Sequence, residues 1–187
     1  MSTQAPICVV AGVGNGSGTG AAAARAFAKK GYSVALIARN PEHLKSIADE
    51  MRANGSDLDR ANFGAESEVR LNKHGKRGAL IFTSATAAWR GNTTTSAFSA
   101  GKHGERALAQ SLNKEFGPQN IHVSNVIIDG PILNGRLEKL TTDKSLLANE
   151  DLRLDPTSIA ASYVYLAHQD RTAWTFELDL RPAHEKW

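Results

Sequence analysis

Short apolar runs alternate with amphipathic stretches along the chain, and this alternation predicts strands and helices in turn. Residues 7–11 and 32–38 are apolar runs of strand length, and an alanine-rich stretch over residues 21–30 separates them. Continuous apolar runs are typical of strands buried on both faces of a parallel sheet. Asn40 and Pro41 then predict a helix start, because asparagine caps a helix and proline suits its first position. The order strand, helix, strand, helix is that of a βαβα unit.

The same rhythm resumes after a polar interruption at residues 55–77, which contain no apolar run of strand length. Beyond it the pattern predicts a strand, a helix, a strand, a helix and a last strand, over residues 79–83, 97–116, 121–128, 155–166 and 174–180. Helices that alternate with apolar strands define an α/β fold. We therefore expect a Rossmann-type, doubly wound parallel sheet of about five strands, in a single domain spanning residues 1–187.

The composition is that of an ordinary globular protein, with 41% hydrophobic and 22% charged residues. No apolar run reaches the length of a membrane span, and no basic stretch followed by an apolar run marks a secretory signal. The single cysteine, Cys8, lies within an apolar run, which favours a buried strand residue in a reducing compartment over a reactive thiol. We therefore expect a cytoplasmic protein without a membrane partner.

The placement of charges and histidines argues against two further classes of function. The net charge is +3, and the lysines and arginines are spread along the chain instead of forming the dense basic stripe of a nucleic-acid surface. The six histidines share no metal-ligand spacing with cysteine or carboxylate residues. We expect neither nucleic-acid binding nor a metal site.

A glycine-rich turn joins the first predicted strand to the first predicted helix. Gly12, Gly16 and Gly18 stand at the spacing G-x-x-x-G-x-G. Glycine at such positions permits a tight turn, lets a pyrophosphate approach the backbone, and lets the helix pack against the strand. The N–H groups and the positive dipole end of the helix favour phosphate. The alternative is a flexible loop, but the strand–turn–helix context favours a dinucleotide site formed by Gly12, Gly14, Asn15, Gly16, Ser17 and Gly18.

The end of the second predicted strand indicates which dinucleotide binds. A Rossmann site for NAD places an acidic residue there, where it accepts hydrogen bonds from the ribose 2′-hydroxyl. This chain has Ala38, Arg39 and Asn40 instead. A guanidinium group pairs well with a phosphate, so Arg39 favours the 2′-phosphate of NADP(H) over the free hydroxyl of NAD(H). The alternative is an ordinary solvated arginine.

Three segments resemble the short-chain dehydrogenase/reductase family. Residues 11–18 resemble its T-G-x-x-x-G-x-G signature, and residues 80–85 match the strand that ends in the family's catalytic serine. Residues 98–102 stand where the family has Tyr-x-x-x-Lys. The resemblance covers residues 5–54 and 76–181, and it implies an oxidoreductase that acts on the carbonyl or alcohol of a small molecule.

The resemblance also implies roles for individual residues and a partner. Gly130 and Ile132 fall in the family's Pro-Gly-x-Val/Ile loop, whose backbone contacts the nicotinamide carboxamide, and Lys102 matches the lysine that bonds the nicotinamide ribose. The helix over residues 97–116 matches the family's subunit interface, so we expect a homo-oligomer. Residues 133–151 are expected to form a lid over the substrate, whose identity the sequence does not reveal.

Three departures from the family weaken the expected chemistry. Phe98 replaces the catalytic tyrosine, and Ala85 takes the place of the serine, which leaves Ser84 as a neighbouring hydroxyl facing the opposite side of the strand. For Lys102 two alternatives remain: it keeps the family's contact with the nicotinamide ribose, or it is an ordinary solvated lysine. Residues 55–77 are an irregular segment where the family has its third and fourth strands, so the first and fifth strands of the family must pair directly or leave the sheet open.

Two functions therefore remain open from the sequence. The first is an NADP(H)-dependent oxidoreductase with weak activity, in which Lys102, Ser84 and Phe98 occupy the catalytic positions. The second is a catalytically inactive dinucleotide-binding or subunit-interaction protein, a truncated or spliced form of a full-length reductase.

Overall fold

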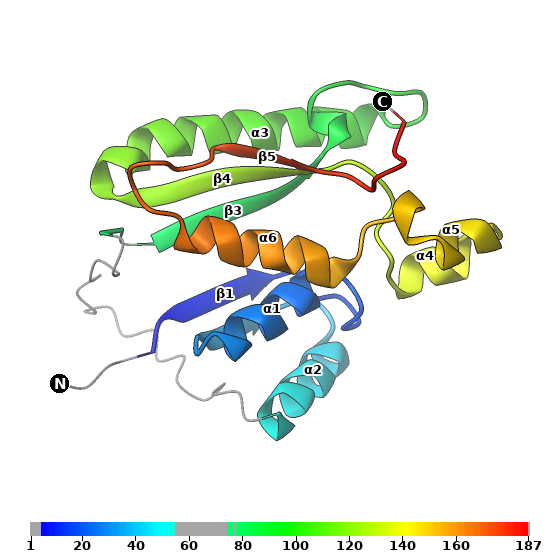
Figure 1. Ribbon diagram of the computed structural model, residues 1–187, viewed down its shortest axis with the longest axis horizontal. Helices are drawn as coiled ribbons and strands as arrows, with labels where there is room; N and C mark the ends of the chain where they lie inside the picture. Colours follow the sequence, from blue (N-terminus) through cyan, green and yellow to red (C-terminus); the bar gives the residue numbers. More distant parts are fainter. Residues whose placement is uncertain (1–4, 55–74, 77, 187) are drawn as a thin grey trace. The chain divides into compact units, whose positions relative to one another are not determined.

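The computed structural model describes residues 5–54, 75–76 and 78–186, which form two compact units. Of the described residues, unit 1 comprises residues 5–54 and 131–164, and unit 2 comprises residues 75–76, 78–130 and 165–186. Parallel strands with accompanying helices occur in both (Figure 1). The expectation of a single domain stays a prediction.

Unit 1 begins with the predicted βαβα unit. The parallel strands β1 (Ile7–Ala11) and β2 (Ser33–Ile37) pair along their whole length, with Ile7 opposite Ser33. Helix α1 (Thr19–Lys29) connects the two strands and packs against both of them. Helix α2 (Pro41–Ala53) follows β2. The apolar runs of the sequence thus form the strands where they were expected.

The start of α2 is fixed by its cap. The Asn40 side chain accepts hydrogen bonds from the backbone N–H groups of Glu42 and His43, at 2.9 and 3.2 Å. Pro41 occupies the first helical position, where its missing N–H costs nothing. Ile47 and Met51, one helical turn apart, form the buried part of the predicted apolar face. The cap and the buried face together fix where α2 begins and how it is rotated.

The polar region that follows residue 131 contains two short helices and a single turn of 3-10 helix, all in unit 1. They are α4 (Gly135–Leu140), α5 (Lys144–Ala148) and η3 (Glu150–Leu152). Each begins at a side-chain cap, supplied by Asn134, Asp143 and Asn149. A bridge between Ile132 and Leu154 closes the segment at its base. The sequence predicted a lid here without its internal structure.

Unit 2 is built on a three-stranded parallel sheet in the order β3-β4-β5. Its strands are β3 (Gly78–Ala85), β4 (Ile121–Ile128) and β5 (Glu177–Leu180). The long helix α3 (Ser96–Phe116) lies along this sheet (Figure 1), and helical turns η1 (Thr86–Ala88) and η2 (Gly117–Gln119) flank it. Helix α6 (Pro156–His168) begins in unit 1 and ends in unit 2.

The start of the last strand differs from the prediction. The sequence pattern placed it at Trp174, whereas β5 begins at Glu177. Trp174 stacks on His122 with ring centroids 5.0 Å apart, and the Thr175 carbonyl accepts a hydrogen bond from Ser124 Oγ at 2.8 Å. These side-chain contacts hold residues 174 and 175 in a connection before the strand.

Burial shifts the pKa values of three titratable side chains in the two units. In unit 2, His122 contacts the Leu166 and Thr175 carbonyl oxygens at 3.1 and 2.9 Å, and burial lowers the pKa of its imidazole. Burial also lowers the pKa of Lys76 to about 8, and the Lys76 ammonium donates to the Leu166 carbonyl at 3.4 Å. In unit 1, burial raises the pKa of the Cys8 thiol to about 11, so this cysteine stays protonated at neutral pH.

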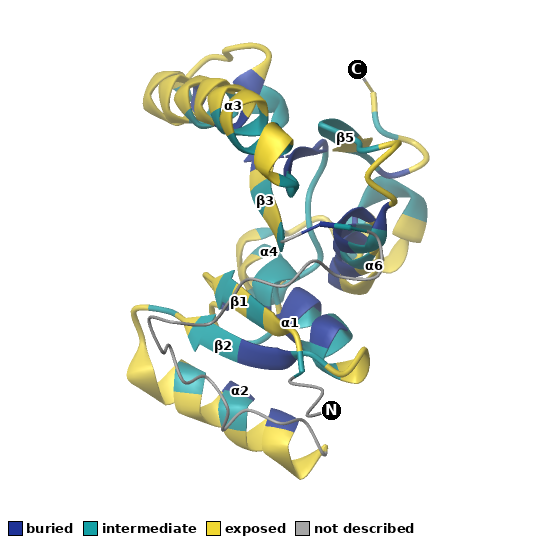
Figure 2. Ribbon diagram, turned by 90° about the vertical axis from the view of Figure 1, so that its left-hand side faces the viewer, coloured by how far each residue is buried: buried dark blue, intermediate teal, exposed yellow. Residues whose placement is uncertain are grey.

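The five strands form two sheets, one in each unit. Among the described residues, β1 pairs with β2 within unit 1, and β3 pairs with β4 within unit 2. The prediction for the pairing of the family's first and fifth strands stays a prediction. Figure 2 shows exposed stretches on β1 and β3. The exposed apolar residues of these two strands include Ile7, Val9 and Leu80. The prediction for residues 55–76 falls almost wholly outside the described part of the chain. The α/β fold with five parallel strands is confirmed.

Candidate cofactor-binding site

The turn between β1 and α1 needs glycine for its backbone conformation. Gly12, Gly14 and Gly16 have φ angles of 94°, 59° and 95°, a region that residues with a side chain rarely adopt. Gly12 N donates to the Ile37 carbonyl at 2.8 Å, which ties the turn to the end of β2. The predicted phosphate-binding turn therefore lies beside the carboxyl ends of both strands of unit 1.

Close packing of α1 depends on a glycine that sequence reasoning missed. A Cβ on Gly20 would lie 2.4 Å from the Gly12 carbonyl oxygen, whereas a Cβ on Gly18 would meet nothing within 4 Å. The spacing of the motif predicted this packing role for one of Gly12, Gly16 and Gly18. The structure gives it to Gly20, the last glycine of the same cluster.

Two further predicted residues, Asn15 and Ser17, brace the turn. Ser17 Oγ donates to Asn15 Oδ1 at 2.7 Å and accepts a hydrogen bond from the backbone N–H of Gly135 at 2.9 Å. Because Gly135 is the first residue of α4, the predicted lid is fastened to the glycine-rich turn within unit 1. A Cβ on Gly135 would lie 3.0 Å from Asn15 Nδ2, so the contact is close.

An arginine on α1, Arg25, contacts the glycine-rich turn, and no sequence pattern indicated this contact. Arg25 Nη1 donates to the Gly16 carbonyl at 2.9 Å, while Arg25 Nε and Nη2 contact both carboxylate oxygens of Glu50 at 2.8 and 2.7 Å. The hydrogen bond from Arg25 lowers the pKa of Glu50. One guanidinium therefore connects α1, α2 and the glycine-rich turn.

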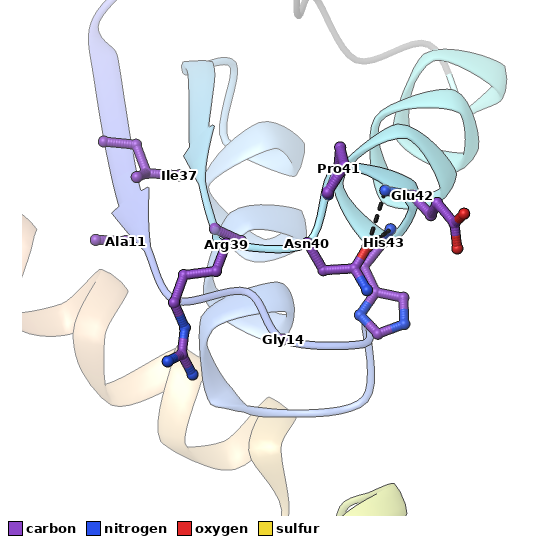
Figure 3. A pocket seen from close by; sticks show the side chains of 10 residues that line it. Ala11, Gly14, Ile37, Arg39, Asn40, Pro41, Glu42 and His43 are labelled. Carbon is purple, nitrogen blue, oxygen red and sulfur yellow. Dashed lines mark hydrogen bonds between the residues drawn. The ribbon is translucent and has the colours of Figure 1, made fainter.

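A groove of about 1120 Å³ opens between this turn and the start of α2 (Figure 3). Its lining comes from the glycine-rich turn, the end of β2 and the first turn of α2: Ala11, Gly12, Gly14, Ile37, Ala38, Arg39, Asn40, Pro41, Glu42 and His43. Arg39 brings a guanidinium into the lining where an NAD site has a carboxylate. The lining therefore combines the glycine-rich turn with a basic side chain.

Of the other predicted residues, Lys102, Phe98, Ser84 and Gly130 lie in unit 2, where the Lys102 ammonium has all of its donors engaged. The ammonium donates to the Thr83 carbonyl at 2.8 Å and to both Glu105 carboxylate oxygens at 3.0 Å. An ammonium has three N–H donors, so these three contacts use all of them. Phe98, one helical turn earlier on α3, is 52% exposed and offers no hydroxyl.

Ser84 lies in the interior of unit 2. It is 3% exposed, and its Oγ has no hydrogen-bond partner among the described residues. Its neighbour Ala85, which takes the place of the family's serine, points to the opposite face of β3 because side chains alternate along a strand. Because Ser84 is buried within unit 2, its hydroxyl is not accessible to a substrate there. The catalytic role of Ser84 stays a prediction.

The predicted nicotinamide loop is divided between the units. Gly130, in unit 2, has φ 139°, and a Cβ there would lie 2.8 Å from the Pro182 ring, so glycine is required. Ile132, in unit 1, forms the bridge to Leu154. The structure thus gathers the glycine-rich turn, Arg39 and Ile132 in one unit, and Lys102, Ser84, Phe98 and Gly130 in the other.

The described residues contain neither a membrane-spanning helix nor a metal-binding cluster. None of their helices has both the length and the apolar character needed to cross a membrane. They also contain no group of three or more histidine, cysteine, aspartate and glutamate side chains placed to hold a metal ion.

Parallel strands with a glycine-rich turn at their carboxyl ends define a Rossmann-type nucleotide-binding fold. Comparison with family sequence patterns then identifies the family. The pattern of the short chain dehydrogenase family matches residues 8–73 and 63–144, and this chain belongs to that family. A comparison with curated proteins gave no match.

Solved structures of the same fold cover nearly all of the chain. A short-chain dehydrogenase from Rhodopseudomonas palustris is 27% identical, with a TM-score of 0.66 over 95% of this chain and 98% of that one. An NADPH-bound short chain oxidoreductase from Pseudomonas aeruginosa PAO1, described as containing an atypical catalytic center, is 16% identical, with a TM-score of 0.75 over 97% of each chain. L-sorbose reductase from Gluconobacter frateurii, complexed with NADPH and L-sorbose, is 16% identical, with a TM-score of 0.75 over 98% of each chain. The last two similarities show the fold alone.

Proposed function

We propose that this chain binds NADP(H) in the groove of unit 1 and acts as a weak oxidoreductase on the carbonyl or alcohol of a small molecule. One observation carries the proposal: Arg39 lines the groove at the end of β2, where no acidic residue stands. A carboxylate there would accept hydrogen bonds from a free 2′-hydroxyl, whereas a guanidinium pairs with a phosphate. The NADPH-bound relatives of the same fold support this choice of cofactor.

The chain's own residues would share the work of holding the cofactor. The glycine-rich turn offers its backbone to the pyrophosphate, Arg39 pairs with the 2′-phosphate, and the backbone at Gly130 and Ile132 serves the nicotinamide end. A bound NADPH supplies a hydride for the reduction of a carbonyl. For Lys102 to reach the nicotinamide ribose, it must give up at least one of its contacts with Thr83 and Glu105.

Two features of α3 favour a second candidate function. Phe98 has no proton to give, and Glu105 holds the lysine that would orient the cofactor. A positioned general acid contributes roughly 10² to 10⁴ in rate, so its loss alone makes carbonyl reduction slow. The alternative is therefore a catalytically inactive dinucleotide-binding or subunit-interaction protein, and turnover separates the two.

The remaining expectations follow the family. We propose a homo-oligomer through α3, which buries only Ser99 and Ala109 within the chain and leaves Phe98 and Leu108 more than half exposed, at 52% and 51%. A small-molecule substrate and a cytoplasmic location belong to the same proposal.

The cofactor proposal is tested by equilibrium titration of the wild type and of Arg39→Ala with NADPH and NADH. A hydrogen-bonded charge pair contributes about 1.5–3 kcal/mol, so Arg39→Ala should weaken NADPH binding about 10-fold or more and leave NADH binding nearly unchanged. Lys45→Ala is the matched control, because Lys45 is an exposed cation of α2 outside the groove lining. Equal losses for both cofactors in Arg39→Ala would refute the assignment.

A further inference from the structure

The peptide group between Gly16 and Ser17 lies in the middle of the glycine-rich turn. Gly16 has a φ angle of 95°, and positions 14 and 18 are glycine as well. Because glycine adopts left-handed and right-handed backbone conformations at similar energy, the local sequence leaves the direction of this peptide group poorly determined. A contact from another element is therefore needed to fix it.

Arg25 of α1 makes such a contact. Its Nη1 donates to the Gly16 carbonyl oxygen at 2.9 Å, and a Cβ on Gly16 would lie 3.7 Å from Arg25 Nη2, so the guanidinium lies directly against the turn. The C=O and N–H bonds of a trans peptide point in opposite directions. With the carbonyl held by Arg25, the Ser17 N–H points away from the guanidinium, where it donates at 3.3 Å to Asn15 Oδ1. The peptide group therefore presents its N–H, and not its carbonyl, on the side opposite Arg25.

Glu50 of α2 holds the guanidinium in this position. Arg25 Nε and Nη2 donate to the two Glu50 carboxylate oxygens at 2.8 and 2.7 Å, which leaves Nη1 for the Gly16 carbonyl. Two parallel hydrogen bonds between a planar guanidinium and a carboxylate set the direction of the whole group. The Arg25 and Glu50 side chains are 32% and 45% exposed, and an ion pair so open to solvent contributes little to stability. Its main consequence here is the placement of Nη1.

The direction of the peptide group between Gly16 and Ser17 matters for a phosphate. A carbonyl oxygen repels a phosphate, whereas the N–H groups at a helix start attract it. Gly18, at the N-cap of α1, makes no side-chain capping bond to the N–H groups of the first turn, whereas Asn40 engages those of α2. The start of α1 thus offers N–H donors to an anion, provided that the neighbouring Gly16 carbonyl is turned away from it.

We infer that Arg25 is a positioning residue for the pyrophosphate of the dinucleotide: by holding the Gly16 carbonyl, it keeps the turn in the conformation that presents N–H groups to the phosphates. The inference rests on the proposed function, because it assigns a role within the same cofactor site. Arg25 acts on the two phosphates that NADPH and NADH share, whereas Arg39 acts on the 2′-phosphate that only NADPH carries. Arg25 therefore sets the affinity for both cofactors, and Arg39 sets the preference between them.

The test measures the NADPH and NADH affinities of the wild type and of Arg25→Met by equilibrium titration, together with urea unfolding of each protein. Arg25→Met keeps a long side chain of good helix propensity but removes the donor to Gly16. It should weaken the binding of both cofactors by the same factor, about 3- to 10-fold, the size expected for the loss of one hydrogen bond. The ratio of the two affinities should stay that of the wild type.

Glu50→Ala is the matched control for a purely structural role of Arg25. It breaks the ion pair between α1 and α2 as Arg25→Met does, but it leaves Arg25 able to donate to the Gly16 carbonyl. The two variants should therefore lose similar stability, while Glu50→Ala keeps both affinities within about 2-fold of the wild type. Lys29→Met controls for the loss of a cation, because Lys29 is exposed in the last turn of α1, at the end opposite the glycine-rich turn.

A ligand without a pyrophosphate gives an independent readout. Adenosine 2′-monophosphate carries the adenosine and the 2′-phosphate alone, and its affinity is measured in competition with NADPH. It should bind Arg25→Met as tightly as the wild type, and it should bind Arg39→Ala more weakly. Weaker binding of this ligand to Arg25→Met would show that Arg25 does not act through the pyrophosphate.

The outcomes separate the inference from the proposed function. The inference is overturned by unchanged affinities in Arg25→Met, by a loss confined to NADPH, or by a loss in Glu50→Ala or Lys29→Met as large as that in Arg25→Met. In each of these cases the proposed function stands as long as Arg39→Ala still loses its preference for NADPH. If the wild type binds neither cofactor, or if Arg39→Ala weakens both equally, the proposed function fails and the inference fails with it.

Discussion

Single residues decide whether the turn between β1 and α1 can exist, and Gly20 is the sharpest case. Alanine normally stabilises a helix interior relative to glycine by roughly 0.5–1 kcal/mol. At Gly20, however, a Cβ would lie 2.4 Å from the Gly12 carbonyl oxygen, a backbone atom that cannot move without distorting the phosphate-binding turn.

We therefore predict that Gly20→Ala destabilises the protein by about 1–3 kcal/mol, as overpacking does elsewhere. Gly18→Ala is the matched control, because its φ of −99° suits any residue and a Cβ there meets nothing within 4 Å. Urea unfolding with a common m-value measures both. A Gly20→Ala variant as stable as the wild type would show that α1 does not pack this closely.

The sequence revealed some of these residues and not others, for a physical reason. The glycine cluster and Arg39 were predictable because the motif and the end of a strand are local features. Arg25 was not, because its partner Glu50 lies on another helix, 25 residues away. His43 was missed for a different reason: its place in the groove depends on the rotation of α2 about its axis, which the Asn40 cap sets.

Among the elements, α3 contains the positions on which catalysis in the family depends. It presents Phe98 where the family has tyrosine, and Lys102 one turn later, held by Glu105. A carbonyl that accepts hydride becomes an alkoxide-like oxygen, and a proton must neutralise the charge as it forms. Neither Phe98 nor Ala85 offers one.

We predict that the wild type oxidises NADPH very slowly with any carbonyl, and that Phe98→Tyr raises the rate, by at most the roughly 10² to 10⁴ that a positioned acid contributes. Phe98→Leu is the control, since it changes the side chain without adding a hydroxyl. The absorbance of NADPH, followed over a panel of aldehydes and ketones, measures the rate. Brisk wild-type turnover that Lys102→Ala leaves unchanged would show that the active site lies elsewhere.

Elements were predicted well where they are long and apolar. The strand over residues 121–128 is observed with the predicted bounds, and α2 starts at the predicted cap. By contrast α4 and α5, of 6 and 5 residues, are too short for a periodic pattern to appear. They are fixed by caps and by the contact of Gly135 with Ser17, which no local rule reveals.

At the scale of the whole molecule, the described strands are all parallel, two of them in unit 1 and three in unit 2. Five strands could be counted from the sequence, but the pairing of segments far apart in the chain depends on contacts that no local pattern encodes. The edge strands β1 and β3 keep exposed apolar side chains such as Val9 and Leu80. The glycine-rich turn and the Arg39 groove both lie in unit 1, so the adenosine half of the proposed site does not depend on how the two sheets are joined.

The most direct test of the account is an equilibrium titration of the unmodified protein with NADPH and with NADH at the same pH and ionic strength, followed by cofactor fluorescence. The account predicts saturable binding of both cofactors, with NADPH bound about 10-fold or more tightly, because only its 2′-phosphate pairs with Arg39. Binding that is equal for the two cofactors, tighter for NADH or absent for both would contradict it.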